Sequence, residues 1–201
     1  MARPSIFDRE AAIEAAMQEM WRNGYEASSV KAVSEKLGIT RSSYYNAFGT
    51  REDLFKEALA VYFAQSPDAV LHGGLPDMPI PVLLTRTFRA ICKARAEDPE
   101  ARGCLAINSL SELDTLHDEL GVMIANAVLH SAARLEDLLK LAVSAGELAE
   151  QTDVHAMALA LQNLLIGLNL FSKALRDEQE LWLTASTTLK ALGLYREDEH
   201  A

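Results

Sequence analysis

Hydrogen-bonding side chains are concentrated between residues 40 and 46, where the chain reads Thr-Arg-Ser-Ser-Tyr-Tyr-Asn. Arginine can donate two hydrogen bonds to a guanine edge, asparagine can pair with adenine, and hydroxyl groups can reach phosphates or bases. A solvated helix of an ordinary three-helix core would instead carry mostly Glu, Lys and Ala. The segment therefore indicates a helix that reads double-stranded DNA. The candidate contacts are Thr40, Arg41, Ser42, Ser43, Tyr44, Tyr45 and Asn46.

The residues before this segment predict a helix and a tight turn that hold it in place. Three apolar residues share one face of residues 30–37, and Ser28 or Ser29 can cap the N-terminus of that helix. Gly38 tolerates the positive φ angle of a sharp turn, and Ile39 can fill the angle between the two helices. Two short helices joined in this way are typical of a helix-turn-helix.

Residues 8–59 resemble the N-terminal part of the TetR family of bacterial transcriptional regulators. The resemblance rests on two stretches, W-R-N-G-Y-E-A-S-S-V and K-L-G-I-T-R-S-S-Y-Y-N-A-F-G-T-R-E-D-L-F. It implies that Thr40, Arg41, Ser42, Ser43, Tyr45 and Asn46 face the groove and its phosphates, and that Arg51 contacts the DNA backbone. Tyr44 stands where the family has Leu or Ile, so it either faces DNA or packs inward. We add Ser28, Ser29 and Arg51 to the candidate DNA-binding residues.

The net charge of −10 is unfavourable for a protein that binds a polyanion over its whole surface. The charge is unevenly distributed, because residues 1–56 hold eight basic and eight acidic side chains. The acidic excess therefore lies in residues 57–201. A neutral DNA-reading segment on an acidic body indicates a protein that touches DNA at one end only, and it excludes a nonspecific coating protein.

Composition favours an all-α protein. The chain has 201 residues, of which 49% are hydrophobic and few are aromatic, and this suits a helical core rich in Ala and Leu. Residues 1–10 lack the apolar core of a secretion signal, so we expect a cytoplasmic protein. Cys92 and Cys104 are too few for a disulfide framework, which agrees with a reducing compartment.

Apolar periodicity predicts six more helices in the remainder of the chain. They cover residues 51–65, 81–97, 106–113, 116–145, 154–175 and 180–192. Residues 66–79, rich in Pro and Gly, form the clearest loop. We divide the chain into a helix-turn-helix DNA-binding domain over residues 1–50 and a ligand-binding and dimerisation domain over residues 51–201.

Residues 154–172 contain no charged side chain, a length that is sufficient to span a membrane. Interrupting polar residues and the lack of flanking aromatic belts argue against a membrane span. A soluble helix that is apolar on most sides needs its own core on one side and a partner on another. We therefore predict a homodimer built on this helix and on residues 180–192, and the TetR resemblance implies the same arrangement. The predicted interface residues are Leu161, Leu164, Leu165, Leu168 and Phe171.

Residues 101–113 contain a second segment of interest, A-R-G-C-L-A-I-N-S-L-S-E-L. It resembles a G-C-L-x-x-N-[ST] signature in a subset of TetR-type regulators, some of which respond to reactive electrophiles or small unsaturated acids. Cys104 would lie in the first turn of a helix, where unpaired backbone N–H groups favour a thiolate. The alternative is a small cysteine that only packs. The sequence leaves both roles open.

A small-molecule site in a helical body is expected to be apolar with a few polar anchors. The candidate effector-binding residues are Phe88, Cys104, Asn108, Met123, Met157, Gln162 and Asn163. The histidines and cysteines lack metal-ligand spacing, and no nucleotide-binding or catalytic motif occurs. We therefore expect no metal, no cofactor and no enzymatic activity.

The sequence thus predicts an all-α protein with an N-terminal three-helix helix-turn-helix DNA-binding domain and a larger C-terminal helical effector and dimerisation domain. Its expected function is that of a homodimeric transcriptional repressor, which a small-molecule effector releases from a double-stranded DNA operator. We expect no membrane partner. Two alternatives remain: a protein-interaction adaptor that has kept the fold, and an enzyme built on the helical body.

Overall fold

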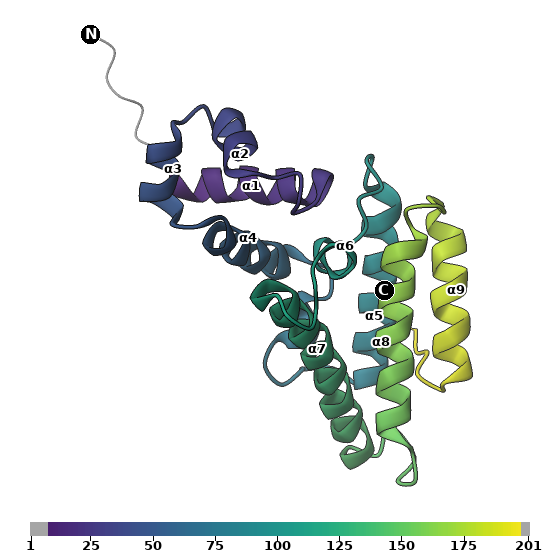
Figure 1. Ribbon diagram of the computed structural model, residues 1–201. Helices are drawn as coiled ribbons and strands as arrows, with labels where there is room; N and C mark the ends of the chain where they lie inside the picture. Colours follow the sequence, from purple (N-terminus) through teal and green to yellow (C-terminus); the bar gives the residue numbers. More distant parts are fainter. Residues whose placement is uncertain (1–7, 198–201) are drawn as a thin grey trace.

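The computed structural model describes residues 8–197, which form nine α-helices and one short 3₁₀ helix with no strand among them. The predicted absence of a secretion signal concerns residues that lie mostly outside this range. Figure 1 shows a small N-terminal group of helices beside a longer helical bundle. The elements are α1 (Arg9–Asn23), α2 (Val30–Leu37), α3 (Arg41–Phe48), α4 (Arg51–Gln65), η1 (Ala69–His72), α5 (Ile80–Glu97), α6 (Leu105–Glu112), α7 (Glu119–Ser144), α8 (Val154–Phe171) and α9 (Glu178–Ala191). This architecture confirms the predicted all-α fold.

Each helix of the N-terminal group begins at a capping side chain. Asp8 accepts a hydrogen bond from the backbone of Ala11, and Ser29 and Thr40 cap α2 and α3 in the same way. Gly38 ends α2 in the left-handed conformation with φ of +65°, which residues with a β-carbon adopt at a cost. The local sequence therefore fixes the turn that orients α3, as predicted.

The core of the N-terminal group continues into the rest of the chain. Met20, Tyr44 and Phe55 are fully buried in it, and Leu105 of α6 and Leu120 of α7 belong to the same apolar cluster. The helix α4 packs along α1. A domain boundary between residues 50 and 51 remains a prediction. The helix α4, which follows this boundary, shares one core with helices that precede the boundary and with helices that come later in the chain.

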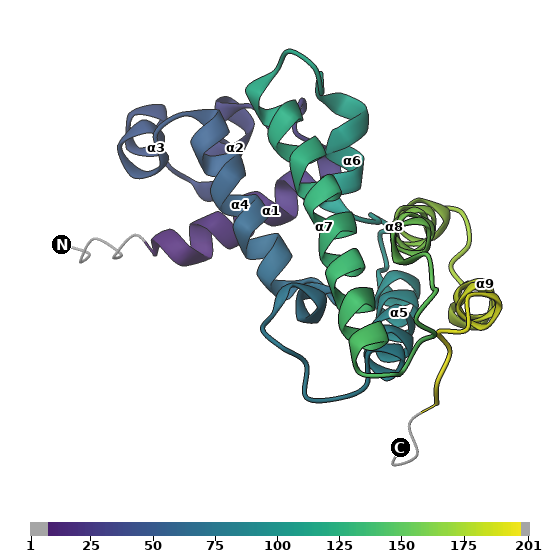
Figure 2. The same ribbon diagram turned by 90° about the horizontal axis from the view of Figure 1, so that it is seen from below.

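The longer helices pack in two pairs, α7 with α8 and α5 with α9 (Figure 1 and Figure 2). Phe88, Leu139, Leu161 and Leu181 come from these four helices and are fully buried at their common core. The bundle therefore provides a second core, beside the one that supports α3.

The observed boundaries differ from the predicted ones by a few residues. The helix α7 begins at Glu119 instead of residue 116, because the carboxylates of Asp114 and Asp118 accept backbone N–H groups and form a turn before it. The helix α8 ends at Phe171 instead of residue 175. These shifts leave the order of the elements unchanged.

Within residues 8–197, α8 is the one helix that is long and apolar enough to cross a membrane, with a mean hydropathy of 1.5. It packs against α5, α6, α7 and α9, so core packing accounts for one side of its apolar surface. The other side is exposed and is described below.

Candidate DNA-binding helix and effector pocket

The helix α3 presents most of its polar side chains to solvent. Arg41, Ser42, Ser43, Tyr45 and Asn46 are all exposed, and Tyr45 shows 54% of its surface. Among the described residues, the Arg41 guanidinium has no hydrogen bond or ion pair. This face of α3 is therefore free to hydrogen-bond in a DNA groove.

Hydroxyl residues near α3 have mainly local roles. Ser28 is buried and donates to the carbonyl of Gly24 at 2.7 Å, so it is not available to DNA, contrary to prediction. Ser29 caps α2 and remains exposed. Thr40 caps α3, and its Oγ1 lies 2.9 Å from the Ser43 hydroxyl. Thr40 and Ser29 can still reach DNA, because both are exposed.

Tyr44 packs inward, so its prediction as a DNA contact is wrong. Its side chain is fully buried, with its ring centroid 5.3 Å from that of Phe48 and 5.7 Å from that of Tyr45. Burial raises the pKa of its hydroxyl to about 12. Tyr44 thus belongs to the core that supports α3, and its neighbour Tyr45 belongs to the surface.

Arg51 holds the turn between α1 and α2. Its Nε donates to the carbonyl of Ser28 at 3.2 Å, and a second guanidinium nitrogen donates to the carbonyl of Tyr25. The guanidinium also lies over the Tyr25 ring, 3.9 Å from its centroid. These contacts use the group that was predicted to bind a phosphate, so we correct Arg51 to a structural residue.

A pocket of about 400 Å³ lies between the end of α4, η1, α6, α7 and α8. Its lining is mainly apolar, and its polar side chains include His72, Ser131, Gln162 and Asn169. Gln162 is 9% exposed, and its Oε1 has no hydrogen-bond partner among the described residues. Burial lowers the pKa of His72. The pocket has the size and the apolar character of a small-molecule site.

Two of the predicted effector-binding residues, Cys104 and Gln162, line this pocket. The other predicted effector-binding residues do not line it. Phe88 and Met157 pack in the core of the bundle, and Met123 packs against the N-terminal core.

The two predicted asparagines are also outside the pocket. Asn108 donates to the carbonyl of Arg102 and accepts from Lys173, while Asn163 is exposed on α8. Asn169 was not predicted, although it lies seven residues after Gln162 and so shares its helix face. His72 was not predicted either, because the Pro- and Gly-rich loop gives no periodic signal.

Cys104 is the residue just before α6, whereas we predicted it in the first turn of that helix. It is half-buried, and its thiol is one of the groups that raise the pKa of the Tyr62 hydroxyl, after burial itself. Cys92, by contrast, is buried on α5, and burial raises the pKa of its thiol to about 12. The two cysteines therefore differ in access, and only Cys104 faces the pocket.

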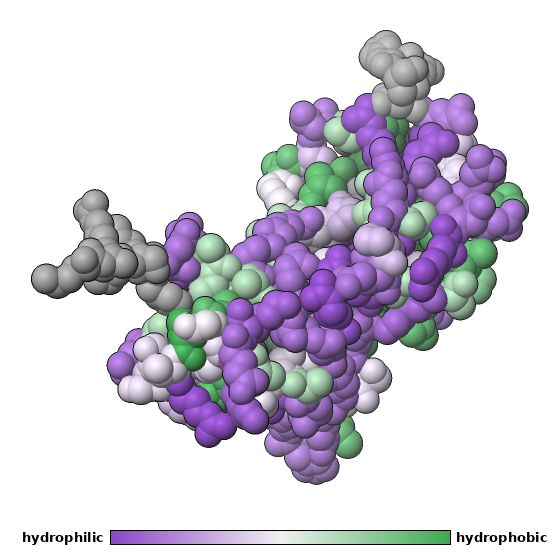
Figure 3. Space-filling model, turned by 90° about the horizontal axis from the view of Figure 1, so that it is seen from above, coloured by the Kyte–Doolittle hydropathy of each residue, from purple (hydrophilic) through white to green (hydrophobic). Residues whose placement is uncertain are grey.

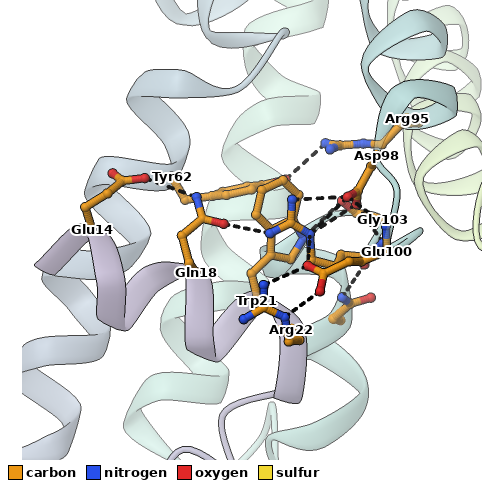
Figure 4. Close-up of polar contacts among 11 residues, drawn as sticks. Glu14, Gln18, Trp21, Arg22, Tyr62, Arg95, Asp98, Glu100 and Gly103 are labelled. Atoms are coloured by element: carbon orange, nitrogen blue, oxygen red, sulfur yellow. Dashed lines mark hydrogen bonds and ion pairs between the residues drawn. The ribbon is translucent and has the colours of Figure 1, made fainter. Parts of the chain in front are cut away.

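Polar contacts fasten α1 to the segment that joins α5 and α6 (Figure 4). The indole Nε1 of Trp21 donates to the carbonyl of Gly103 at 3.1 Å. The Arg102 guanidinium lies over the Trp21 ring, 3.8 Å from its centroid. It also donates a hydrogen bond to the Gln18 side chain at 2.6 Å and forms an ion pair with Asp98. Because Cys104 follows Gly103 directly, these contacts connect the pocket wall to the DNA-binding end.

The predicted dimer interface is wrong for three of its five residues. Leu161, Leu165 and Leu168 are buried in the core of this protomer, at 3% exposure or less, so a partner cannot reach them. Leu164 is half-buried against the same core. Phe171 alone is well exposed, at 47%.

A different apolar surface covers α8 and α9. We call it the α8/α9 face and define it by Leu159, Leu170 and Phe171 of α8 and Leu183 of α9, all of which are exposed. Figure 3 shows hydrophobic residues interspersed among hydrophilic ones on the surface of the molecule. These four large exposed apolar side chains are candidates for contact with a partner.

The described residues contain no group of three or more His, Cys, Asp or Glu side chains that could hold a metal ion.

Comparison with known proteins places this geometry among DNA-binding regulators. Residues 12–58 match the family described as bacterial regulatory proteins, tetR family, and residues 83–187 match the tetracyclin repressor-like C-terminal domain. The second match covers more than half of the chain.

Individual relatives agree with the family match. The HTH-type transcriptional repressor ComR of Escherichia coli (strain K12) is 27% identical, over 94% of this chain and 90% of its own. The transcriptional regulator AcuR of Cereibacter sphaeroides is 26% identical, over 74% and 68%. A cysteine-substituted TetR family regulator CifR, solved with 26-bp double-stranded operator DNA, is 28% identical over 94% of this chain and 99% of its own, with a TM-score of 0.81.

A helix-turn-helix with an exposed polar second helix, attached to a helical bundle, defines a DNA-binding transcriptional regulator. The chain belongs to the TetR family of such regulators. It is therefore a regulator and not an enzyme.

Proposed function

We propose that the protein is a homodimeric repressor that leaves its operator when a small molecule fills the pocket between α4, α6, α7 and α8. Relatives named as repressors and the operator-bound CifR structure support the repressor role. The exposed face of α3 supports reading of the major groove. The proposed DNA contacts are Ser29, Thr40, Arg41, Ser42, Ser43, Tyr45 and Asn46.

A dimer is needed because two α3 helices must enter successive major grooves about 34–36 Å apart. The α8/α9 face supports this assembly, since it leaves four large apolar side chains in water in the single protomer. Packing of two such faces would cover them and fix the distance between the two α3 helices.

The observation that carries the proposal is the bond between Trp21 and Gly103. Gly103 lies beside the pocket residue Cys104, and a β-carbon at Gly103 would approach the carbonyl of the pocket residue Asn169 to 2.6 Å. A ligand that displaces either wall would therefore disturb the contact between Gly103 and Trp21 of α1. The effector lowers operator affinity by its preference for the released conformation, and by no more than that.

Two finer assignments accompany the proposal. Residues 103–109 read G-C-L-A-I-N-S, so we assign the chain to the group of TetR-type regulators with that segment. We also propose a cytoplasmic location and no membrane partner, since an operator-binding protein must reach the chromosome.

The test is a selection of genomic fragments with the purified protein, followed by footprinting of the recovered site. We expect one or a few sites with two half-sites on the same face of the duplex. Enrichment of no specific sequence would contradict the proposal and favour the adaptor alternative.

A further inference from the structure

Among the described residues that line the pocket, Gln162 has a buried side-chain oxygen without a hydrogen-bond partner. Its side chain is nine-tenths buried, and its Oε1 has no hydrogen-bond partner within residues 8–197. Around it the pocket wall is apolar, with Leu165 and Ile166 on α8 and Val128 on α7. More than about nine-tenths of buried polar groups in native proteins are paired, because an orphaned group loses its hydration without compensation. A ligand with a hydrogen-bonding group would supply the missing partner of the Gln162 Oε1.

The charges around the pocket disfavour an anionic ligand. Among the described residues, no Lys or Arg lines it. Its one carboxylate, Asp68, accepts a hydrogen bond from the Ser66 hydroxyl. Burial lowers the pKa of His72, which favours its neutral imidazole, and His130, the other histidine of the lining, is exposed to solvent. An anion would therefore lose its hydration without gaining a Lys or Arg partner, and a cation would meet a carboxylate that the Ser66 hydroxyl already engages.

We propose that the pocket takes an uncharged, mainly apolar molecule whose hydroxyl group pairs with the Gln162 amide. This inference rests on the proposed role of the pocket as the effector site. A hydroxyl group both donates and accepts, so it suits the amide in either orientation. The volume of about 400 Å³ lies within the range of ~300–1,000 Å³ of small-molecule sites.

The test uses four probes of one shape: benzyl alcohol, toluene, benzoate and benzylamine. Dissociation constants are measured by NMR titration of the full chain without DNA. We expect benzyl alcohol to bind about tenfold more tightly than toluene, because one buried hydrogen bond separates them. We expect both charged probes to bind more weakly than the alcohol.

Two variants locate the effect. In Gln162→Leu, the affinities for benzyl alcohol and toluene should become equal within about twofold. Gln162→Met serves the same purpose if the leucine variant does not fold. The control Gln179→Leu removes an exposed amide from α9 and should keep the tenfold preference.

Four results would overturn this ligand class: equal wild-type affinities for alcohol and toluene, an unchanged preference in Gln162→Leu, tighter binding of a charged probe, or binding of none of the probes. Operator affinity is measured separately in the presence of each probe. If the alcohol binds through Gln162 without changing operator affinity, the ligand class stands and the proposed regulation fails. If benzoate binds and releases the operator, the regulation stands and the ligand class fails.

Discussion

The Nε of Arg95 donates a hydrogen bond to the Oδ1 of Asn169 at 2.5 Å, and this contact links the pocket between α4, α6, α7 and α8 to the DNA-binding end of the molecule. Asn169 lines the pocket. Arg95 is 4% exposed, and its second donor reaches the Tyr62 hydroxyl of α4 at 3.0 Å (Figure 4). No carboxylate pairs with it among the described residues. A ligand that displaces Asn169 therefore disturbs the group that holds α4.

Replacement of Arg95 by Met should lower the free energy of unfolding by about 1–3 kcal/mol, because it leaves the buried Asn169 oxygen without a donor. Urea unfolding followed by circular dichroism measures the change. Lys93→Met, on the exposed side of the same helix, should change stability by less than ~0.5 kcal/mol. Equal stability of the two variants would remove Arg95 from the link between pocket and α4.

Arg51→Ala should destabilise the protein rather than weaken its contact with DNA phosphates. The substitution removes two hydrogen bonds to the turn after α1 and the stacking on Tyr25. We expect a loss of roughly 1–3 kcal/mol in unfolding free energy, with an unchanged dependence of operator affinity on salt concentration. A salt slope smaller by about two per dimer would instead restore Arg51 as a phosphate contact.

The α8/α9 face gives a direct test of dimerisation. Leu170 is 59% exposed in the protomer, so Leu170→Glu should leave the protomer folded. In a dimer it would bury an unpaired carboxylate, at a cost of about 3–5 kcal/mol, and sedimentation velocity at micromolar concentration should show monomers.

Two further leucines serve as controls for this experiment. Leu116→Glu, in the exposed turn before α7, should remain a dimer. Leu165→Glu should fail to fold, because it places a charge in the protomer core. A stable Leu170→Glu dimer would show that the partner binds elsewhere.

The two cysteines should react at different rates. Cys104 is half-buried at the pocket, whereas burial raises the pKa of the Cys92 thiol to about 12. A small alkylating agent should therefore modify Cys104 first and weaken operator binding. Cys104→Ser should bind the operator and resist this release.

Mass spectrometry after limited alkylation, together with a gel-shift assay, follows both effects. Prior modification of Cys92, or release of the Cys104→Ser variant, would assign Cys104 a packing role.

The fold was predictable because capping residues and apolar periods are local signals. Asp8, Ser29, Thr40 and Gly38 each act within a few residues of their position. The side of a helix that faces a partner is not a local signal, since α8 is apolar on most of its sides. Leu165 was therefore assigned to an interface although it lies in the protomer core.

The residues of the functional sites divide in the same way: positions set by local sequence could be predicted, and positions set by packing could not. The exposed polar face of α3 could be predicted, but the inward position of Tyr44 depends on packing against Phe48. The pocket was found in part, through Cys104 and Gln162. The contribution of His72 depends on how the loop before α5 folds back beside α7, which no periodic pattern encodes.

Operator affinity tests most directly whether α3 reads the operator. It is measured by fluorescence anisotropy for the wild type and for Arg41→Ala. Both proteins are titrated on the selected operator and on its single-base variants. Arg41 is exposed on α3 and free to donate to a base edge. We expect a loss of ~1–3 kcal/mol on the operator, with relaxed preference at one base position per half-site. Lys93→Ala, on the body, should bind as the wild type does. Unchanged affinity and unchanged base preference in Arg41→Ala would contradict the claim that α3 reads the operator.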